Sequence, residues 1–274
     1  MKFPWKTPRA DRVVGQQFNM ANVWRYIVRS VQGDSHLADG TPCQDSNRVQ
    51  VLTSSLAGTL VACVADGAGS AKHSAIGSLV ACNSLVESID AYLQAHRSIT
   101  EVDNRVILEW CSQARLAIEV EANAREAVLT DFATTLEVAV LTSTGSCFFQ
   151  IGDGAIVLHH HSVWGVVFWP ESGEYFNTTT FITSKEFRER LQWYVTPVVF
   201  DEVALFTDGI ERLALRFDSQ TPHTPFFAPL FQALRSVPDW QNLGDNLEAF
   251  LRSESVRKRS DDDKTLILAA RIHE

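Results

Sequence analysis

The sequence has no apolar run long enough to cross a membrane. A membrane-spanning helix needs about 20 predominantly apolar residues, and the 274 residues contain no uninterrupted stretch of that kind. The N-terminal residues lack the apolar core of a secretory signal peptide. We therefore expect no membrane partner and predict a cytoplasmic protein.

Cysteine is scarce and does not form a metal or disulfide motif. The five cysteines are an odd number, and no Cys-x-x-Cys pair occurs. A zinc site is therefore not indicated. Four of the five lie in or beside strand-like or helical apolar runs, so we expect free core thiols in a reducing compartment.

Basic blocks are also missing. Lys and Arg total 24 against 33 Asp and Glu, which gives a formal net charge of −9. This balance argues against a protein that binds nucleic acid through its phosphates. It does not argue against a site for phosphate, because bound cations can dominate the local charge.

No linker rich in proline, glycine or serine divides the chain. We therefore expect a loose N-terminal arm over residues 1–22 and a single domain over residues 23–274. At 45% hydrophobic residues, this domain can bury a sizeable core. Residues 170–200 have no regular periodicity, and an irregular stretch of that length in a compact domain is usually functional or mobile.

The spacing of apolar residues predicts the secondary structure. We expect strands over 24–31, 49–52, 59–65, 134–141, 147–151, 155–159, 163–168, 203–206 and 266–271, a polar loop over 34–46, and helices over about 71–95, 106–127, 226–236 and 240–252. Two successive helices cannot both cross between parallel strands, so they should cover one face of an antiparallel sheet. The order predicts an α+β fold, a four-layer α/β/β/α sandwich of two antiparallel sheets flanked by helices.

An apolar strand that ends in Asp-Gly occurs three times. The pairs are Asp66-Gly67, Asp153-Gly154 and Asp208-Gly209. A buried strand brings its last residue to a fixed point, and the glycine lets the backbone turn sharply. One such pair is usually only a turn, but three strand ends of this kind suggest carboxylates that converge.

Two further acidic clusters lie near predicted strands. Asp45 lies in the early polar loop, and Asp261, Asp262 and Asp263 lead into the last strand. Converging carboxylates repel one another unless a cation neutralises them. A site made of oxygen ligands favours hard cations such as Mg²⁺, Mn²⁺ or Ca²⁺.

Together these motifs resemble the type 2C protein phosphatases, the metal-dependent (PPM) Ser/Thr phosphatase family. The matching residues are Asp45, Asp66-Gly67, Asp153, Asp208-Gly209 and Asp262-Asp263-x-Thr265, in the order and spacing of that family. The match covers roughly residues 25–272, and only the set as a whole is specific. His36 with residues 43–45, and the stretch 173–183, look like a bacterial branch that often accompanies Ser/Thr kinases.

The resemblance implies a role for each acidic residue at two cations. Asp66 would bridge the two ions, with the carbonyl of Gly67 as a further ligand. Asp208 and Asp262 would hold one ion, and Asp45 would lie on the side of the other, acting through bound water. The two cations would lower the pKa of a bridging water, and the metal-bound hydroxide would attack phosphorus.

The resemblance also implies a third, weaker cation site at Asp153, which would share Asp208. The expected cofactors are thus two or three Mn²⁺ or Mg²⁺ ions. Residues 170–200 would correspond to a flap beside the metal site. The implied substrate is a phosphorylated protein, with a Ser/Thr kinase as a further possible partner in bacterial signalling.

Two positions depart from the pattern of the animal enzymes. Gly40 stands where an Arg normally binds substrate phosphate, and Ala68 stands where a His normally follows the first Asp-Gly. His36 is a candidate for either role and is grouped with Asp45 and Asp66 as a catalytic residue. A loop histidine without a catalytic role is the alternative for His36.

The sequence therefore predicts a protein-serine/threonine phosphatase. Two alternatives remain open. One is a regulatory or binding module of the same fold with little turnover, which the missing Arg and His favour. The other is a two-metal phosphohydrolase that acts on small phosphate esters such as nucleotides or sugar phosphates.

Overall fold

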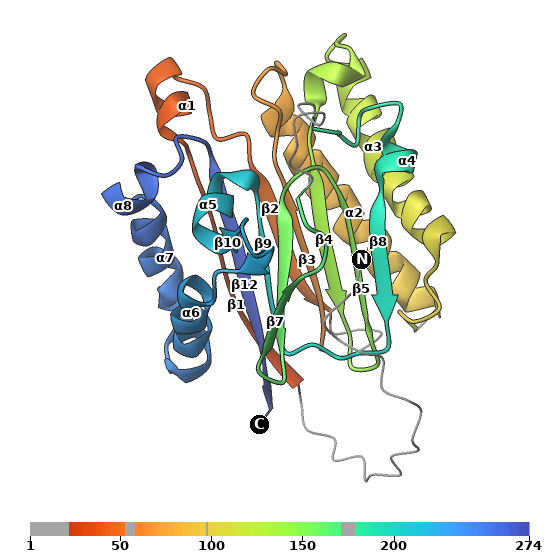
Figure 1. Ribbon diagram of the computed structural model, residues 1–274. Coiled ribbons are helices and arrows are strands. Elements are labelled where there is room, and N and C mark those ends of the chain that lie inside the picture. The colour runs from red at the N-terminus through yellow and green to blue at the C-terminus, as the bar shows by residue number, and fades with distance from the viewer. Residues whose placement is uncertain (1–21, 53–57, 97, 171–178, 274) are drawn as a thin grey trace.

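The computed structural model describes residues 22–52, 58–96, 98–170 and 179–273. Residues 1–21 of the expected N-terminal arm and residues 171–178 of the expected flap lie outside this part of the chain. In the described part, two antiparallel five-stranded sheets stack face to face with helices on both outer sides (Figure 1). The predicted α/β/β/α sandwich is confirmed.

Each sheet is built from strands distant in sequence. The first sheet has the order β1 (Asn22–Val31), β12 (Lys264–His273), β9 (Glu202–Phe206), β6 (Ala155–His160) and β7 (Val163–Val166). The second has the order β2 (Ser46–Leu52), β3 (Thr59–Ala65), β4 (Leu136–Leu141), β5 (Ser146–Ile151) and β8 (Gln192–Thr196). The four consecutive strands β4 to β7 therefore divide between the two sheets.

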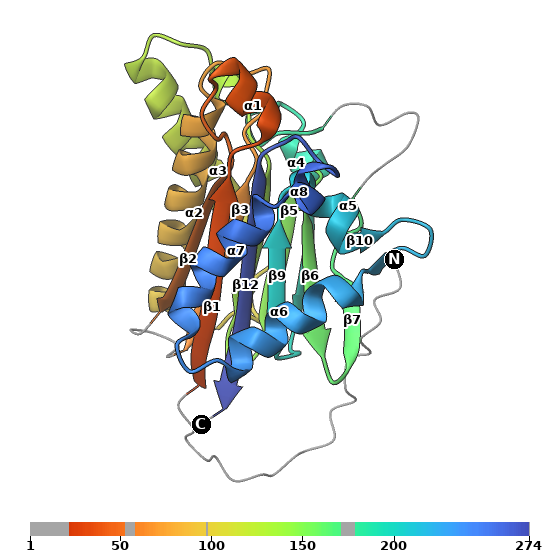
Figure 2. The same ribbon diagram turned by 90° about the vertical axis from the view of Figure 1, so that its left-hand side faces the viewer.

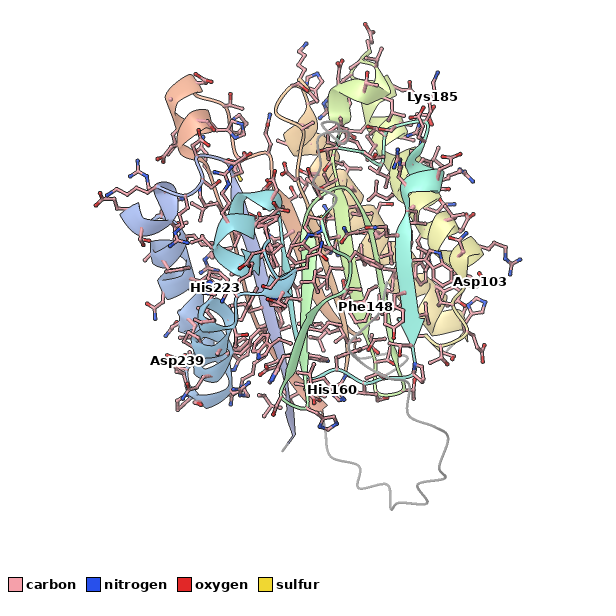
Figure 3. The ribbon with its side chains drawn as sticks, in the orientation of Figure 1. Asp103, Phe148, His160, Lys185, His223 and Asp239 are labelled. Carbon is pink, nitrogen blue, oxygen red and sulfur yellow. The ribbon has the colours of Figure 1, made fainter. Side chains whose placement is uncertain are left out.

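Two pairs of helices form the outer layers. The helices α2 (Ser74–His96) and α3 (Asn104–Ala124) cover the second sheet, and α6 (Thr224–Ser236) and α7 (Leu243–Leu251) lie across the first (Figure 2). The side chain of Asp103 accepts the backbone N–H of Val106 at 3.0 Å (Figure 3), which caps the start of α3. Pro225 lies in the first turn of α6, where the backbone N–H has no partner within the helix.

Short elements complete the described chain. They are α1 (Asp34–Asp39), η1 (Leu129–Phe132), α4 (Phe187–Arg190), η2 (Asp208–Ile210), α5 (Glu211–Ala214), β10 (Leu215–Arg216), β11 (Thr221–Pro222), η3 (Trp240–Asn242) and α8 (Glu254–Arg257). The region expected as a polar loop over 34–46 thus contains the helix α1. The region expected as irregular over 170–200 contains α4 and the edge strand β8.

The core has three parts. One lies between α2, α3 and the second sheet, and another between the first sheet and α6 and α7. The third lies between the sheets and includes Phe148, whose ring is 5.7 Å from that of Phe200 (Figure 3). All seven residues of β3 are buried, because this central strand is covered on both faces.

The run of three histidines at residues 159–161 lies at the end of the sandwich opposite α1 (Figure 3). The Nδ1 atom of His159 lies 2.6 Å from Glu202, and that of His160 lies 3.7 Å from Asp201. His161 turns the chain into β7 with a positive φ of 47°. The first two histidines thus pair with different carboxylates.

Within the described residues, the search for a helix both long and apolar enough to span a membrane found none.

Candidate metal and catalytic centre

The register of the strands brings their acidic ends to one edge of the sandwich. The last residue of β3 pairs with the first of β2, and the last of β5 pairs with the first of β4. In the first sheet, the last residue of β9 pairs with the first of β6 and the third of β12. The residues at this edge are Asp45, Asp66, Asp153, Asp208 and Asp262. The helix α1 lies at the same end (Figure 1).

Asp66, directly after β3, is the centre of this cluster. Burial raises the pKa of Asp66 well above its usual range, and the charges of Asp45, Asp208 and Asp262 raise it further. The close approach of the carboxyl group of Asp208 also raises the pKa of Asp66. Four of the five predicted acidic ligands therefore lie within electrostatic reach of one another.

Asp45 is buried beneath this cluster. The hydroxyl of Thr207 donates to its Oδ2 atom at 2.8 Å and accepts the backbone N–H of Thr265 at 3.0 Å. Burial raises the pKa of Asp45 to about 8, while hydrogen bonds from Thr207 and Thr265 oppose the rise. The two threonines thereby tie Asp45 to the end of β9 and the start of β12.

Asp208 begins η2 and is held close to the start of β12. A side chain on Gly209 would overlap the carbonyl oxygen of Asp263, so this approach requires glycine. Burial, and then the charges of Asp153 and Asp262, raise the pKa of Asp208 to about 6. Asp262 is exposed, so the cluster extends from the interior to the solvent.

Asp153 lies in the turn between β5 and β6. The hydroxyl of Thr179 donates to its Oδ2 atom at 2.5 Å, which joins the turn to the chain just after residues 171–178. The charge of Asp153 also acts on Glu211, the first residue of α5. Burial, and then the charges of Asp208 and Asp153, raise the pKa of Glu211 to about 8. Glu211 was not among the residues predicted from the acidic motifs. No periodic signal marks Glu211, because it begins a helix of only four residues.

Asp263 holds the loop that leads to Asp45. It is 2% exposed and accepts the backbone N–H groups of Gly33 at 2.7 Å and Gln44 at 2.6 Å. The Nδ1 atom of His36 lies 2.9 Å from its Oδ1 atom. The sequence left Asp263 open between a ligand-orienting residue and a solvated turn residue. Its burial and its two backbone partners exclude the solvated turn.

Two further predicted site residues, His36 and Gly67, are positioned by contacts with groups other than the five clustered carboxylates. His36 lies on α1, and the polar contact recorded for its side chain is with Asp263, not with the five clustered carboxylates. Gly67 is buried and donates its N–H to the carbonyl of Gln44 at 3.2 Å, beside the loop that carries Asp45. Gly40 ends α1 with a φ of 71°, and a Cβ built on it has no atom within 4 Å.

The donor set fits hard cations. Among the described residues, no group of three or more histidine, cysteine, aspartate or glutamate side chains is placed so that it could hold a metal ion. However, the clustered groups offer only oxygen ligands, and the buried atoms Asp45 Oδ1, Asp208 Oδ1 and Glu211 Oε1 have no hydrogen-bond partner. An unpartnered buried polar group costs about 1–3 kcal/mol, and more when charged. Divalent cations that prefer oxygen ligands would satisfy these atoms.

Comparison with known proteins agrees with this geometry. Residues 32–252 match the family model described as protein phosphatase 2C. The chain belongs to the protein phosphatase 2C family. This confirms the recognition made from the acidic motifs, together with the enzyme class of a protein-serine/threonine phosphatase. The family match ends before Asp262, so the last acidic motif rests on the sequence pattern and on its place in the structure.

One curated relative of this family member is serine/threonine-protein phosphatase 3 of Escherichia coli strain K12. The two are 34% identical over 249 residues, which cover 90% of this chain and 98% of the relative.

Solved structures of lower identity share the fold. The catalytic domain of the phosphatase PstP, solved with two manganese ions, has a TM-score of 0.58 at 16% identity and covers 92% of this chain and 99% of that one. The phosphatase Stp1 of Staphylococcus aureus has a TM-score of 0.59 at 13% identity and covers 93% and 98%.

Proposed function

We propose that this family member hydrolyses phosphoserine and phosphothreonine in proteins at a two-cation centre formed by the acidic edge of the sandwich. The observation that carries the proposal is the position of Asp66, whose carboxyl group lies within reach of Asp45, Asp208 and Asp262. Carboxylates this close together are all ionised only where cations offset their charges, since without cations some of them take up protons.

The proposed ligands follow the predicted set. Asp66 would be shared by two Mn²⁺ or Mg²⁺ ions, with the carbonyl of Gly67 as a further ligand. Asp208 and Asp262 would hold one ion, and Asp45 would lie on the side of the other. When bound, such cations neutralise phosphoryl charge and lower the pKa of a water to near neutrality. No protein nucleophile is required.

Other residues of the chain position the carboxylates of this centre. Thr207 and Thr265 orient the carboxylate of Asp45, and Asp263 holds the loop in front of it. Burial, followed by the charges of Asp45 and Asp263, raises the pKa of the Cys43 thiol. That thiol therefore stays protonated, which makes it a poor nucleophile.

Asp153 and Asp208 would hold a third, weaker ion. The hydrogen bond from Thr179 to Asp153 brings the chain from residue 179 onward beside this ion site, which supports the expected flap for those described residues. The buried free thiols of Cys63, Cys82, Cys111 and Cys147 support a cytoplasmic location. A Ser/Thr kinase that phosphorylates the same substrate is the proposed partner.

A substrate panel separates this proposal from its alternatives. With Mn²⁺ present, we expect a phosphothreonine peptide and an aryl phosphate to be hydrolysed, and nucleotides and sugar phosphates to be much poorer substrates by kcat/KM. A preference for nucleotides would favour a small-ester phosphohydrolase. Manganese binding without turnover of any substrate would favour a binding module, the alternative suggested by Gly40 and Ala68.

We expect His36→Ala to slow peptide hydrolysis far more than aryl phosphate hydrolysis. A serine alkoxide needs a proton as it leaves, whereas a nitrophenolate does not, and general acid catalysis is worth about 10²–10⁴-fold. Nδ1 of His36 lies 2.9 Å from Asp263, so Nε2 is the nitrogen that would donate the proton. The alkaline limb of the peptide pH–rate profile should also flatten. Adding Ala68→His to His36→Ala should partly restore the rate of peptide hydrolysis.

His161→Ala is the matched control, because His161 is exposed in the turn after β6 at the other end of the sandwich. It should leave both rates unchanged. If His36→Ala instead slows both substrates equally, His36 binds phosphate or holds the loop through Asp263, and it is not the acid.

A further inference from the structure

Two buried polar side chains face each other inside the sandwich without partners. Glu137 on β4 is 0% exposed, and neither of its carboxyl oxygens makes an aligned hydrogen bond. Gln150 on β5 is 1% exposed, and both atoms of its amide lack partners. The two residues are directly opposite in the β4–β5 ladder, which puts their Cβ atoms about 4.5–5.5 Å apart.

This pair faces the layer between the two sheets. Side chains alternate along a strand, and the neighbours Leu136 and Val138 belong to the core beneath α2 and α3. Phe148, two residues before Gln150 on the same strand, belongs to the core between the sheets (Figure 3). Each unpartnered buried polar atom is costly there, so packing alone does not account for the pair.

The carboxyl group of Glu137 lies against Gly154, in the turn that carries Asp153. A Cβ built on Gly154 would lie 2.6 Å from Cδ of Glu137 and 2.8 Å from its Oε1. The carboxyl thus packs on the backbone of the residue that follows Asp153. Burial, and then the charge of Asp153, raise the pKa of Glu137 well above its usual range, and the nearby amide of Gly154 opposes the rise. The charge of Asp45 also reaches Glu137.

We propose that Glu137 is an interior acid of the cation centre, which strengthens the binding of a divalent cation on the Asp153 side, and that the facing amide of Gln150 donates to its carboxylate once the cation is bound. The inference rests on the proposed function in one respect, that a cation binds at Asp153. A cation there would reverse the local field and offset the burial of a negative charge. Glu137 acts on the cation through charge and is not a catalytic residue.

The decisive variant is Glu137→Gln, which keeps the shape and removes the charge. In calorimetric titration of the full chain with Mn²⁺, we expect the affinity of the weakest-binding ion to fall about tenfold. This is the effect of removing one negative charge whose attraction to the ion is partly screened. In EDTA, the Tm of the variant should equal or exceed that of the wild type, because a neutral amide replaces a buried acid. The rise in Tm on adding Mn²⁺ should be smaller. A merely structural role predicts a lower Tm in EDTA and unchanged Mn²⁺ affinity.

Two further variants control the test. Glu202→Gln replaces a buried glutamate at the far end of β9, where it pairs with His159, and should leave Mn²⁺ binding unchanged. Gln150→Leu keeps the acid but removes the facing amide, and it should weaken Mn²⁺ binding less than Glu137→Gln does. If Glu137→Gln does not fold, a Gln150→Leu protein with undiminished Mn²⁺ affinity would still count against the proposal.

The outcomes distinguish the two hypotheses. If the wild type binds no Mn²⁺, the proposed function itself fails. If the wild type binds Mn²⁺ and Glu137→Gln gives the same titration curve, the role of Glu137 is overturned while the proposed function stands.

Discussion

Chelation of divalent cations is expected to abolish hydrolysis of both a phosphothreonine peptide and an aryl phosphate, and Mn²⁺ or Mg²⁺ to restore it. The reason is twofold. Water has a pKa of about 15.7 and becomes an effective nucleophile near neutral pH only when a cation lowers that value. In addition, Asp45, Asp66, Asp153, Asp208 and Asp262 would repel a phosphate dianion unless their charge is offset.

The measurement is the initial rate after treatment with EDTA, followed by titration with each metal. EDTA preloaded with Mg²⁺ controls for effects of the chelator itself and should leave the rate unchanged. Substantial turnover in excess free EDTA, after repeated dialysis, would refute a cation-dependent mechanism at this edge. Loss of the aryl phosphate activity alone would not be expected, because both substrates need the same nucleophile.

The positions of the main carboxylates were predictable because they follow from strand ends. The apolar runs before Asp66 and Asp208 are long and buried, so their ends are well defined in the sequence. These two strands lie in different sheets, and the face-to-face stacking of the sheets brings their ends to a common edge. The layers were predictable for a similar reason, since the two helices after β3 are long and bury residues at helical spacing.

The supporting acids were not predictable from the sequence. Asp263 lies in a run of aspartates, and only its contacts with Gly33 and Gln44 show that it is buried. Glu137 interrupts an apolar strand, and a period-two pattern cannot tell which of two covered faces holds it. Glu211 begins a helix of four residues, too short to show a periodic signal.

Two structural elements were missed for physical reasons as well. The helix α1 has six residues and none of them is buried, so it has no apolar stripe to reveal it. The strand β8 lies at the edge of the second sheet and is only partly buried, so its alternation is weak. In both cases tertiary contacts, such as that of Asp263 with Gly33 beside α1, supply what local pattern lacks.

Asp66→Asn and Asp208→Asn are each expected to lower kcat/KM at least about 10²-fold, comparable to the loss of one important electrostatic stabiliser. Asparagine keeps the shape of the side chain but removes one negative charge from a centre proposed to hold two dications. The effect should appear with both peptide and aryl phosphate substrates. Calorimetry should show weaker Mn²⁺ binding by both variants.

The matched control is Asp218→Asn, because Asp218 is an exposed aspartate in the turn after β10. Its side chain accepts a hydrogen bond from the backbone N–H of Ser219. It should change neither turnover nor Mn²⁺ binding. In EDTA, Asp66→Asn should fold at least as stably as the wild type, because burial and the charges of Asp45, Asp208 and Asp262 disfavour the ionised Asp66. A variant that is stable but inactive would therefore have lost cation binding and not its fold. Wild-type turnover together with wild-type Mn²⁺ affinity in either variant would show that its carboxylate is not a ligand.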